Sequence, residues 1–163
     1  MKRKNLAILV LTLAAMMTIL VVSPAVSQDK PADNMQILRD KIKADKKLIV
    51  AANMELTESE AKGFWPVYEA YQKDFDAINQ RIVKLIKSYA ADDMANTLTD
   101  DKAQKLTAEF VNIQKAEAEF QASYVPKLSK VLPPKKVARY LQIENKIRAA
   151  VKYELAKKIP LVE

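Results

Sequence analysis

The sequence predicts an all-α protein, an elongated and curved antiparallel bundle of four helices that follows a cleaved signal peptide. Three observations lead to this prediction. The chain of 163 residues has one glycine and seven prolines, so it holds little material for the tight turns of β-hairpins. Large apolar residues recur at alternating steps of four and three, the spacing of a helix with one buried face. A similar helix-start signal also occurs at three places in the chain.

Residues 1–27 have the three parts of a secretory signal peptide. The basic start 2–4 precedes an apolar run over 6–22, and Ala25 and Ser27 supply the small side chains that signal peptidase accepts. We therefore expect cleavage after Ser27 and a periplasmic location. The alternative is an uncleaved membrane anchor, although a run of about 17 residues is at the short end for crossing a bilayer.

The remaining chain is predicted to be a linker over 28–33 and one helical domain over 34–163. The first helix is expected to start at Asp33 or Asn34 and to end near Asn53. Its apolar positions are spaced for one face of a helix. They are Met35, Leu38, Ile42, Leu48 and Ile49.

The second predicted helix, over 56–89, organises the rest of the chain. Polar residues separate its large apolar side chains, so one face is made to be covered and the other to stay in water. Pro66 lies well inside this pattern, so the helix either kinks near Gly63 and Pro66 or begins at Pro66. The apolar seam consists of Phe64, Tyr68, Tyr71, Phe75, Ile78, Ile82, Leu85 and Tyr89.

Helix starts are marked at Thr57, Thr99 and Pro134. Thr57 and Glu60 have the spacing of a capping box, Thr99 is a second threonine cap, and Pro134 suits a first helical turn. A leucine precedes each of the three starts. These signals begin the second, third and fourth helices.

The third helix, over 100–131, and the fourth, over 134–158, continue the apolar pattern, and each is interrupted by one glutamate. Glu117 and Glu144 on facing helices suggest either paired-carboxylate chemistry or two ion pairs with lysine or arginine. We favour the ion pairs. No P-loop, nucleophile elbow or dinucleotide fingerprint is present, so we expect a protein that is not an enzyme.

The composition narrows the possible chemistry further. The chain has no cysteine and no histidine, which removes disulfides, thiol and imidazole catalysis, and nearly every zinc or copper site. Asp92 with Asp93, or Asp100 with Asp101, offers carboxylates to Ca²⁺ or Mg²⁺. No spaced calcium loop accompanies them, so we interpret them as solvated charges and expect no cofactor and no metal.

The net charge of +7 is concentrated at the end of the chain, where the residues from Lys127 onward include ten basic and three acidic side chains. In an exported protein such a surface meets anionic lipid head groups or acidic segments of other proteins rather than nucleic acid. A merely solvated helix face is the alternative. The basic candidates for protein binding are Lys135, Lys136, Arg139, Lys146 and Arg148.

Aromatic residues beside Pro66 are the other binding candidates. Phe64, Trp65 and Tyr68 are either core residues or an aromatic surface for client chains that a kink at Pro66 opens. Trp65 lies off the seam that Phe64 and Tyr68 define, so we expect it to face outward.

The signal peptide, the four helices and the paired starts Leu56–Thr57 and Leu98–Thr99 together resemble the Spy/CpxP family of small periplasmic proteins with LTxxQ motifs. Glu60 and Lys102 occupy the glutamine position of the motif here. The resemblance implies a curved four-helix protein, usually an antiparallel dimer, that acts as an ATP-independent chaperone or stress-signalling modulator. Metal-sensing relatives use histidines, so metal sensing is not implied.

Two functions follow as expectations. The first is a periplasmic chaperone-like protein or stress-signalling modulator that binds unfolded or partner proteins of the envelope. The second is an envelope structural or adaptor protein that forms a homodimer through its apolar seam and binds membrane or a partner through its basic C-terminal helix. A large exposed apolar patch favours the first, and a wholly polar surface favours the second.

Overall fold

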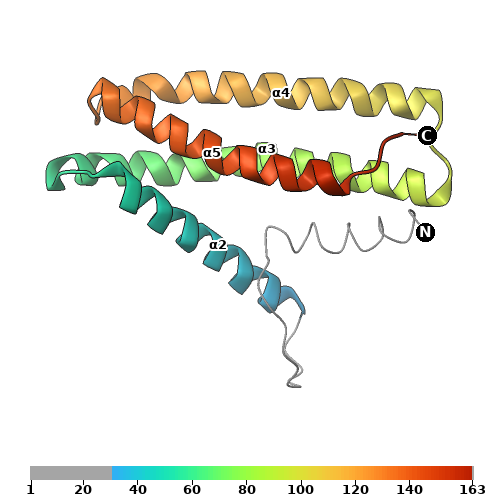
Figure 1. The fold of residues 1–163 in the computed structure, drawn as a ribbon, viewed down its shortest axis with the longest axis horizontal. Coiled ribbons are helices and arrows are strands. Elements are labelled where there is room, and N and C mark those ends of the chain that lie inside the picture. The colour runs from blue at the N-terminus through green and yellow to red at the C-terminus, as the bar shows by residue number, and fades with distance from the viewer. Residues whose placement is uncertain (1–30, 163) are drawn as a thin grey trace.

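The computed structural model describes residues 31–162, and every regular element in that range is helical (Figure 1). This confirms the all-α prediction. The predicted signal peptide and the first residues of the predicted linker lie outside the described residues. The helices are α2 (Pro31–Met54), α3 (Glu58–Ala95), α4 (Asp100–Ser129) and α5 (Pro134–Lys158).

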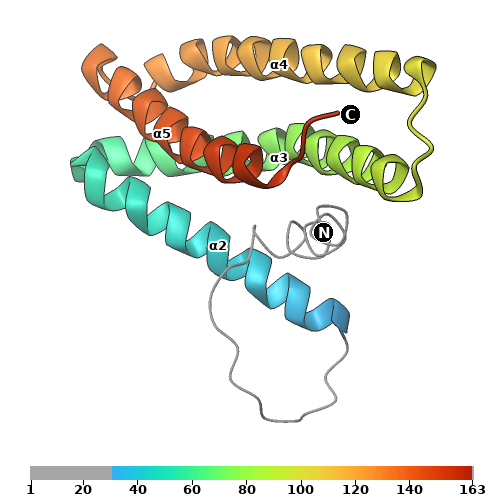
Figure 2. The same ribbon diagram turned by 45° about the vertical axis from the view of Figure 1, so that its right-hand side comes forward.

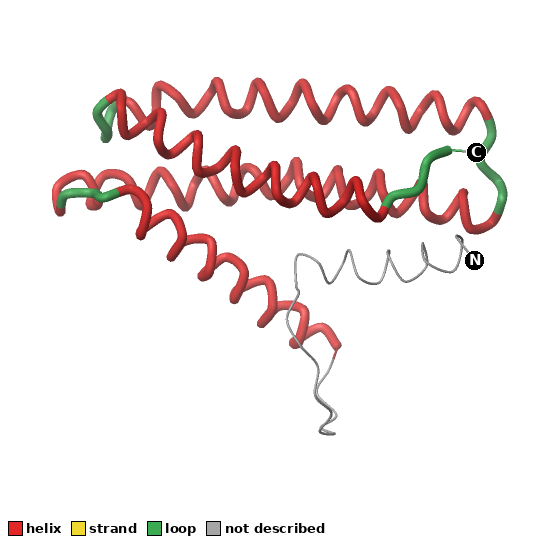
Figure 3. Tube along the Cα trace, viewed as in Figure 1, coloured by secondary structure: helices red, strands yellow, loops and turns green. Residues whose placement is uncertain are grey.

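The helices build an elongated body with one projecting arm. α3 and α4 form a long antiparallel hairpin, and α5 returns along this hairpin to lie over α3 (Figures 1 and 2). α2 is joined to the start of α3 and leaves the body at an angle in both views. Figure 3 shows that short loops connect the four helices.

Local signals placed the starts of α3, α4 and α5 correctly. The Thr57 side chain accepts a hydrogen bond from the Glu60 backbone, and the Glu60 side chain accepts one from the Thr57 backbone, which completes the predicted capping box. Thr99 caps α4 by accepting from the Lys102 backbone N–H. Pro134 occupies the first turn of α5, where its missing N–H has no intrahelical partner to lose.

α2 begins earlier than predicted. It starts at Pro31 rather than at Asp33 or Asn34, so the end of the predicted linker is helical. A proline is well suited to a first helical turn because its fixed φ is already helical. The end of this helix at Met54 is one residue beyond the predicted Asn53.

Pro66 lies inside α3, which runs without interruption from Glu58 to Ala95. The alternative in which the helix begins at Pro66 is therefore wrong. The capping box at Thr57 fixes the start, and a single proline removes only one backbone hydrogen bond from a helix that packing stabilises on both sides of it.

The core follows the predicted seam of α3. Side chains from Phe64 to Ile78 on this seam are buried against α4 and α5, and Ile82 and Leu85 are partly buried. Near the start of α3 the helix approaches the α4–α5 turn so closely that a Cβ on Gly63 would lie 3.1 Å from the Cβ of Val131. The only glycine of the chain therefore stands where two segments need close approach.

The buried face of α2 differs from the predicted one. Leu48 and Ile49, which the pattern placed on the apolar face, are 68% and 49% exposed, whereas Val50 and Met54 are fully buried. Val50 and Met54 lie four residues apart and share one side of the helix. The rotation of α2 about its axis is set by what it meets on α3 and α5, and its own apolar pattern is too weak to decide it.

Candidate functional site

The aromatic side chains at the start of α3 gather with Tyr140 of α5. The ring centroids of Phe64 and Tyr140 are 5.1 Å apart in an edge-to-face arrangement, and Tyr68 lies 6.2 Å from Tyr140. Such pairs stabilise by about 0.5–1.5 kcal/mol beyond the burial of their area. Phe64 and Tyr68 are buried, so the core interpretation is correct for them. Their predicted role as an accessible client surface is wrong for this arrangement of the helices, because both side chains point from α3 towards α5.

Trp65 lies at the rim of this group. It is partly buried, and its ring packs 5.3 Å from that of Tyr68. Lys47 of α2 holds its ammonium 5.1 Å from the indole centroid and also pairs with Glu69 at 2.6 Å. The position of Trp65 off the seam thus leaves it partly accessible, with α2 beside it.

Tyr71 joins the aromatic group to α4. Its ring lies 4.8 Å from Phe120, 5.0 Å from Tyr124 and 5.5 Å from Tyr140, all edge to face. Tyr124 in turn donates a hydrogen bond of 2.5 Å to Asp74. One buried tyrosine therefore contacts aromatic rings from α4 and α5 and links the three helices of the body.

A buried polar cluster ties α2 to this core. Glu144 of α5 is fully buried, and its carboxylate accepts from Lys46 Nζ at 2.9 Å and from Gln72 Nε2 at 2.8 Å. Lys46 also donates to Gln72 Oε1 at 2.7 Å, and Gln72 donates to Tyr140. A buried carboxylate needs such partners because removing its charge from water costs roughly several kcal/mol. The prediction that Glu144 pairs with a basic residue is confirmed.

Arg148 lies one helical turn beyond Glu144 and is also buried. It was predicted as a surface residue for protein binding, and that placement is wrong. Its Nη1 donates to the Tyr71 hydroxyl at 3.2 Å, its guanidinium lies 5.2 Å from the centroid of the Phe75 ring, and its Nη2 is buried without a hydrogen-bond partner. The aromatic seam of α3 draws the guanidinium inward through cation–π contact.

Glu117 of α4 is buried and pairs with Lys152 of α5. The two glutamates that interrupt the apolar stripes are thus each neutralised by a lysine from another helix. This arrangement matches the ion-pair interpretation of the sequence.

Burial changes the acidity of the core phenols. It raises the pKa of Tyr71 to about 12, and the nearby Glu144 carboxylate acts in the same direction. Burial likewise raises the pKa of Tyr68 and of Tyr140, with Glu144 adding to both shifts. These tyrosines therefore remain neutral well above their ordinary range.

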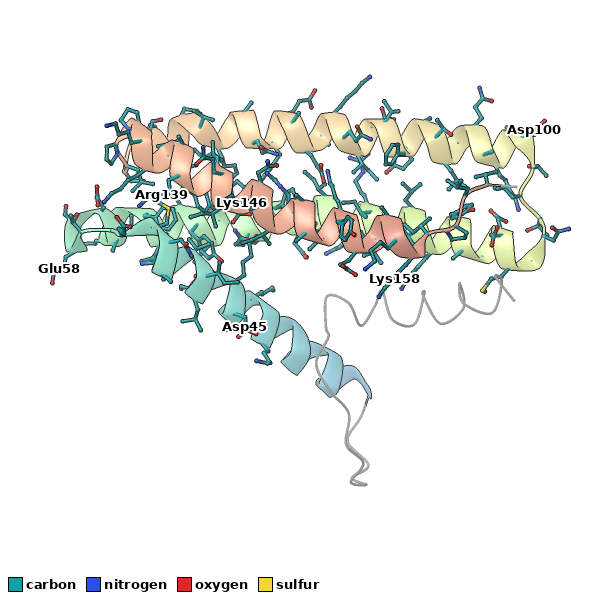
Figure 4. All side chains as sticks on the ribbon, in the orientation of Figure 1. Asp45, Glu58, Asp100, Arg139, Lys146 and Lys158 are labelled. Atoms are coloured by element: carbon teal, nitrogen blue, oxygen red, sulfur yellow. The ribbon has the colours of Figure 1, made fainter. Side chains whose placement is uncertain are left out.

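The basic candidates divide into paired and exposed residues. Lys136 donates to Glu60 at 2.5 Å and to the Glu55 carbonyl, and this contact lowers the pKa of Glu60. Arg139 pairs with Glu55 at 3.1 Å, at the end of the body where α3 begins (Figure 4). Lys135 and Lys146 are exposed. The basic final quarter is therefore partly used to hold the start of α3 against α5.

Exposed large apolar side chains lie outside the core on each of the four described helices. On α2, Leu48 and Ile49 directly follow the exposed Lys47 in the chain. On α4, Phe110 is 54% exposed and Val111 is exposed beside it. Neighbouring exposed apolar side chains point to an interaction surface more strongly than isolated ones do.

Residues that sequence reasoning missed are Lys46, Gln72, Val50 and Met54. Lys46, Val50 and Met54 recur at steps of four, which is a helical spacing, but the polar first member hid the line. Lys46 faces the core because it pairs with Glu144, and a partner 98 positions away cannot be recognised from the local pattern.

Among the described residues, no group of three or more carboxylates is placed to hold a metal ion. A search of the same residues for a helix long and apolar enough to cross a membrane finds none. No protein-family model matches the sequence, and comparison with curated proteins and with solved structures gives no match.

Proposed function

We propose that this is a periplasmic protein that binds unfolded or partner proteins of the envelope without ATP, as a chaperone-like protein or stress-signalling modulator. The observation that carries the proposal is the exposed pair Leu48 and Ile49 on α2, which directly follows Lys47 in the chain. Lysines attract unfolded chains over long range, and apolar side chains hold them at short range. The signal-like residues 1–27 support the periplasmic location.

The adaptor alternative receives less support. It requires the seam of α3 to be free for a second copy, but the seam side chains are largely covered within one chain. It also requires a free basic helix, whereas Lys136, Arg139 and Lys152 are engaged by carboxylates of other segments. Exposed apolar side chains on α2, α4 and α5 favour protein binding over a wholly polar surface.

The test is suppression of aggregation of a chemically reduced, unfolded protein at a near-stoichiometric ratio, without nucleotide, at low and at high salt. We expect suppression that weakens as salt is added, because the lysine attraction is screened. The variant Leu48→Ser/Ile49→Ser should lose much of the aggregation suppression. Leu161→Ser/Val162→Ser, which changes two exposed apolar residues at the other end of the chain, is the matched control. No suppression by the wild-type protein at low salt would overturn the proposal.

A further inference from the structure

α2 covers an aromatic surface that would otherwise be open. Its Val50 and Met54 are fully buried in the same core cluster as Phe64, Tyr68 and Tyr140. α2 also packs against α5, and Lys47 lies over the ring of Trp65. The residues that the sequence suggests as a client surface are therefore partly hidden beneath this helix.

The hold on α2 is local. The described side chains before Lys46, at Lys41, Lys43, Ala44 and Asp45, are exposed, and in Figures 1 and 2 the first half of α2 stands away from the body. The last half is fixed by one buried polar contact, Lys46 with Glu144 and Gln72, by the partly exposed Lys47 against Glu69 and Trp65, and by two apolar side chains. At its C-terminal end α2 joins α3 through a short connection that includes Glu55, whose φ of 49° is left-handed.

A second buried basic residue, Arg148, lies one helical turn along α5 from the Glu144 carboxylate that holds α2. Glu144 and Arg148 are four residues apart on α5 and therefore share one side of the helix. In the described arrangement Lys46 and Gln72 take the Glu144 carboxylate, while Arg148 Nη2 is buried without a partner. If α2 moves away, Glu144 loses Lys46 but remains one helical turn from Arg148, which has no carboxylate partner. A new pair between Glu144 and Arg148 would lower the free-energy cost of displacing α2.

We propose that α2 is a displaceable strap, and that the α3–α5 surface beneath it binds an amphipathic helix of a partner protein. The partner helix carries a lysine or arginine followed by apolar side chains four and eight positions later, as α2 does with Lys46, Val50 and Met54. The basic residue meets the buried Glu144 carboxylate, and the apolar pair covers the aromatic side chains. The proposal rests on the proposed function and names the surface and the class of partner.

The probe is a fluorescent synthetic peptide with the sequence of residues 31–54, added in trans to the full chain. Lys46→Glu places a carboxylate against Glu144 and releases the resident strap, whereas Lys43→Glu makes the same charge change at an exposed position of α2. We expect Lys46→Glu to bind the peptide at least about tenfold more tightly than the wild type, since a larger fraction of molecules is open. Lys43→Glu should bind as the wild type does. A peptide that itself carries Lys46→Glu should bind neither.

Hydrogen exchange gives a second readout that does not depend on a variant. Added peptide should speed the exchange of α2 backbone amides in the wild-type protein and leave those of α3 unchanged. Equal peptide affinity of Lys46→Glu and Lys43→Glu, with no change of α2 exchange, would overturn the proposal. A wild-type dimer that exchanges α2 between two copies would also overturn it, because it assigns the surface to a second copy. Peptide binding without aggregation suppression leaves this inference standing and removes only the chaperone-like function.

Discussion

Lys46 and Glu144 are 98 positions apart in the chain, and the Nζ of one lies 2.9 Å from the Oε2 of the other. The lysine side chain is 19% exposed and the glutamate side chain is fully buried. This contact joins the first described helix to the last one. It also determines which side of α2 faces the body.

A double-mutant cycle measures how strongly the pair is coupled. Lys46→Ala and Glu144→Gln, alone and combined, should show a coupling of about 1–3 kcal/mol in urea unfolding, because the pair is shielded from water. The exposed pair Lys41 and Asp45, with side chains 59% and 55% exposed, is the control and should show about 0.5 kcal/mol or less. Equal coupling in the two cycles would contradict the role given to the buried pair.

The seam of α3 should dominate stability. Phe75→Ala leaves a cavity between α3 and α4, where the ring packs 5.3 Å from Phe120, and should cost about 3–5 kcal/mol. Phe110→Ala removes the same ring from an exposed position of α4 and should change stability by less than about 0.5 kcal/mol. Thermal or urea unfolding followed by circular dichroism distinguishes the two. Similar losses in both variants would argue against the described core.

Alkaline pH should unfold the protein through its buried phenols. The pKa of Tyr71 is raised to about 12, and those of Tyr68 and Tyr140 are raised as well. A raised pKa stabilises the fold fully below the unfolded value near pH 10, and the contribution is lost as the pH climbs through the folded pKa. Stability should therefore fall above about pH 10, by up to about 1.4 kcal/mol per pH unit for each such phenol.

Unfolding measured between pH 8 and about pH 12, with absorbance to detect phenolate, tests this window. Tyr71→Phe should flatten the alkaline slope, and Tyr153→Phe, which removes an exposed phenol, serves as its control. An unchanged slope in Tyr71→Phe would show that this side chain is not shielded as described.

The start of α3 should depend on its cap. Thr57→Ala removes the acceptor for the Glu60 backbone N–H and should cost about 1 kcal/mol. Thr99→Ala should cost less, because Lys102 holds the third position of α4 and no reciprocal bond from its side chain completes a capping box there. The two variants can be compared by thermal unfolding. A larger loss at Thr99 would reverse the ranking.

Much of the fold was predictable because its signals are local. Thr57, Thr99 and Pro134 mark helix starts through contacts made within one turn, and the seam from Phe64 to Ile78 has a strong period. These features need no knowledge of distant partners. They account for α3, α4, α5 and the composition of most of the core.

The candidate site was less predictable, because its residues meet across long chain separations. Leu48 and Ile49 satisfy an apolar pattern but face water, since α2 turns Lys46, Val50 and Met54 inward towards α3 and α5. Arg148 counts as a surface charge in the sequence and is buried in the fold. In each case a tertiary partner overrides the preference of the single residue.

A small change of backbone torsion at Glu55, between α2 and α3, moves the distant N-terminal end of α2 by a large distance. A 24-residue helix is about 36 Å long, so a rotation of about 10° at Glu55 sweeps its far tip through about 6 Å. Modest torsional adjustment at one left-handed residue is thus amplified into a displacement larger than the width of a side chain. Because α2 is attached to the body at its C-terminal end, its N-terminal end undergoes the largest displacement.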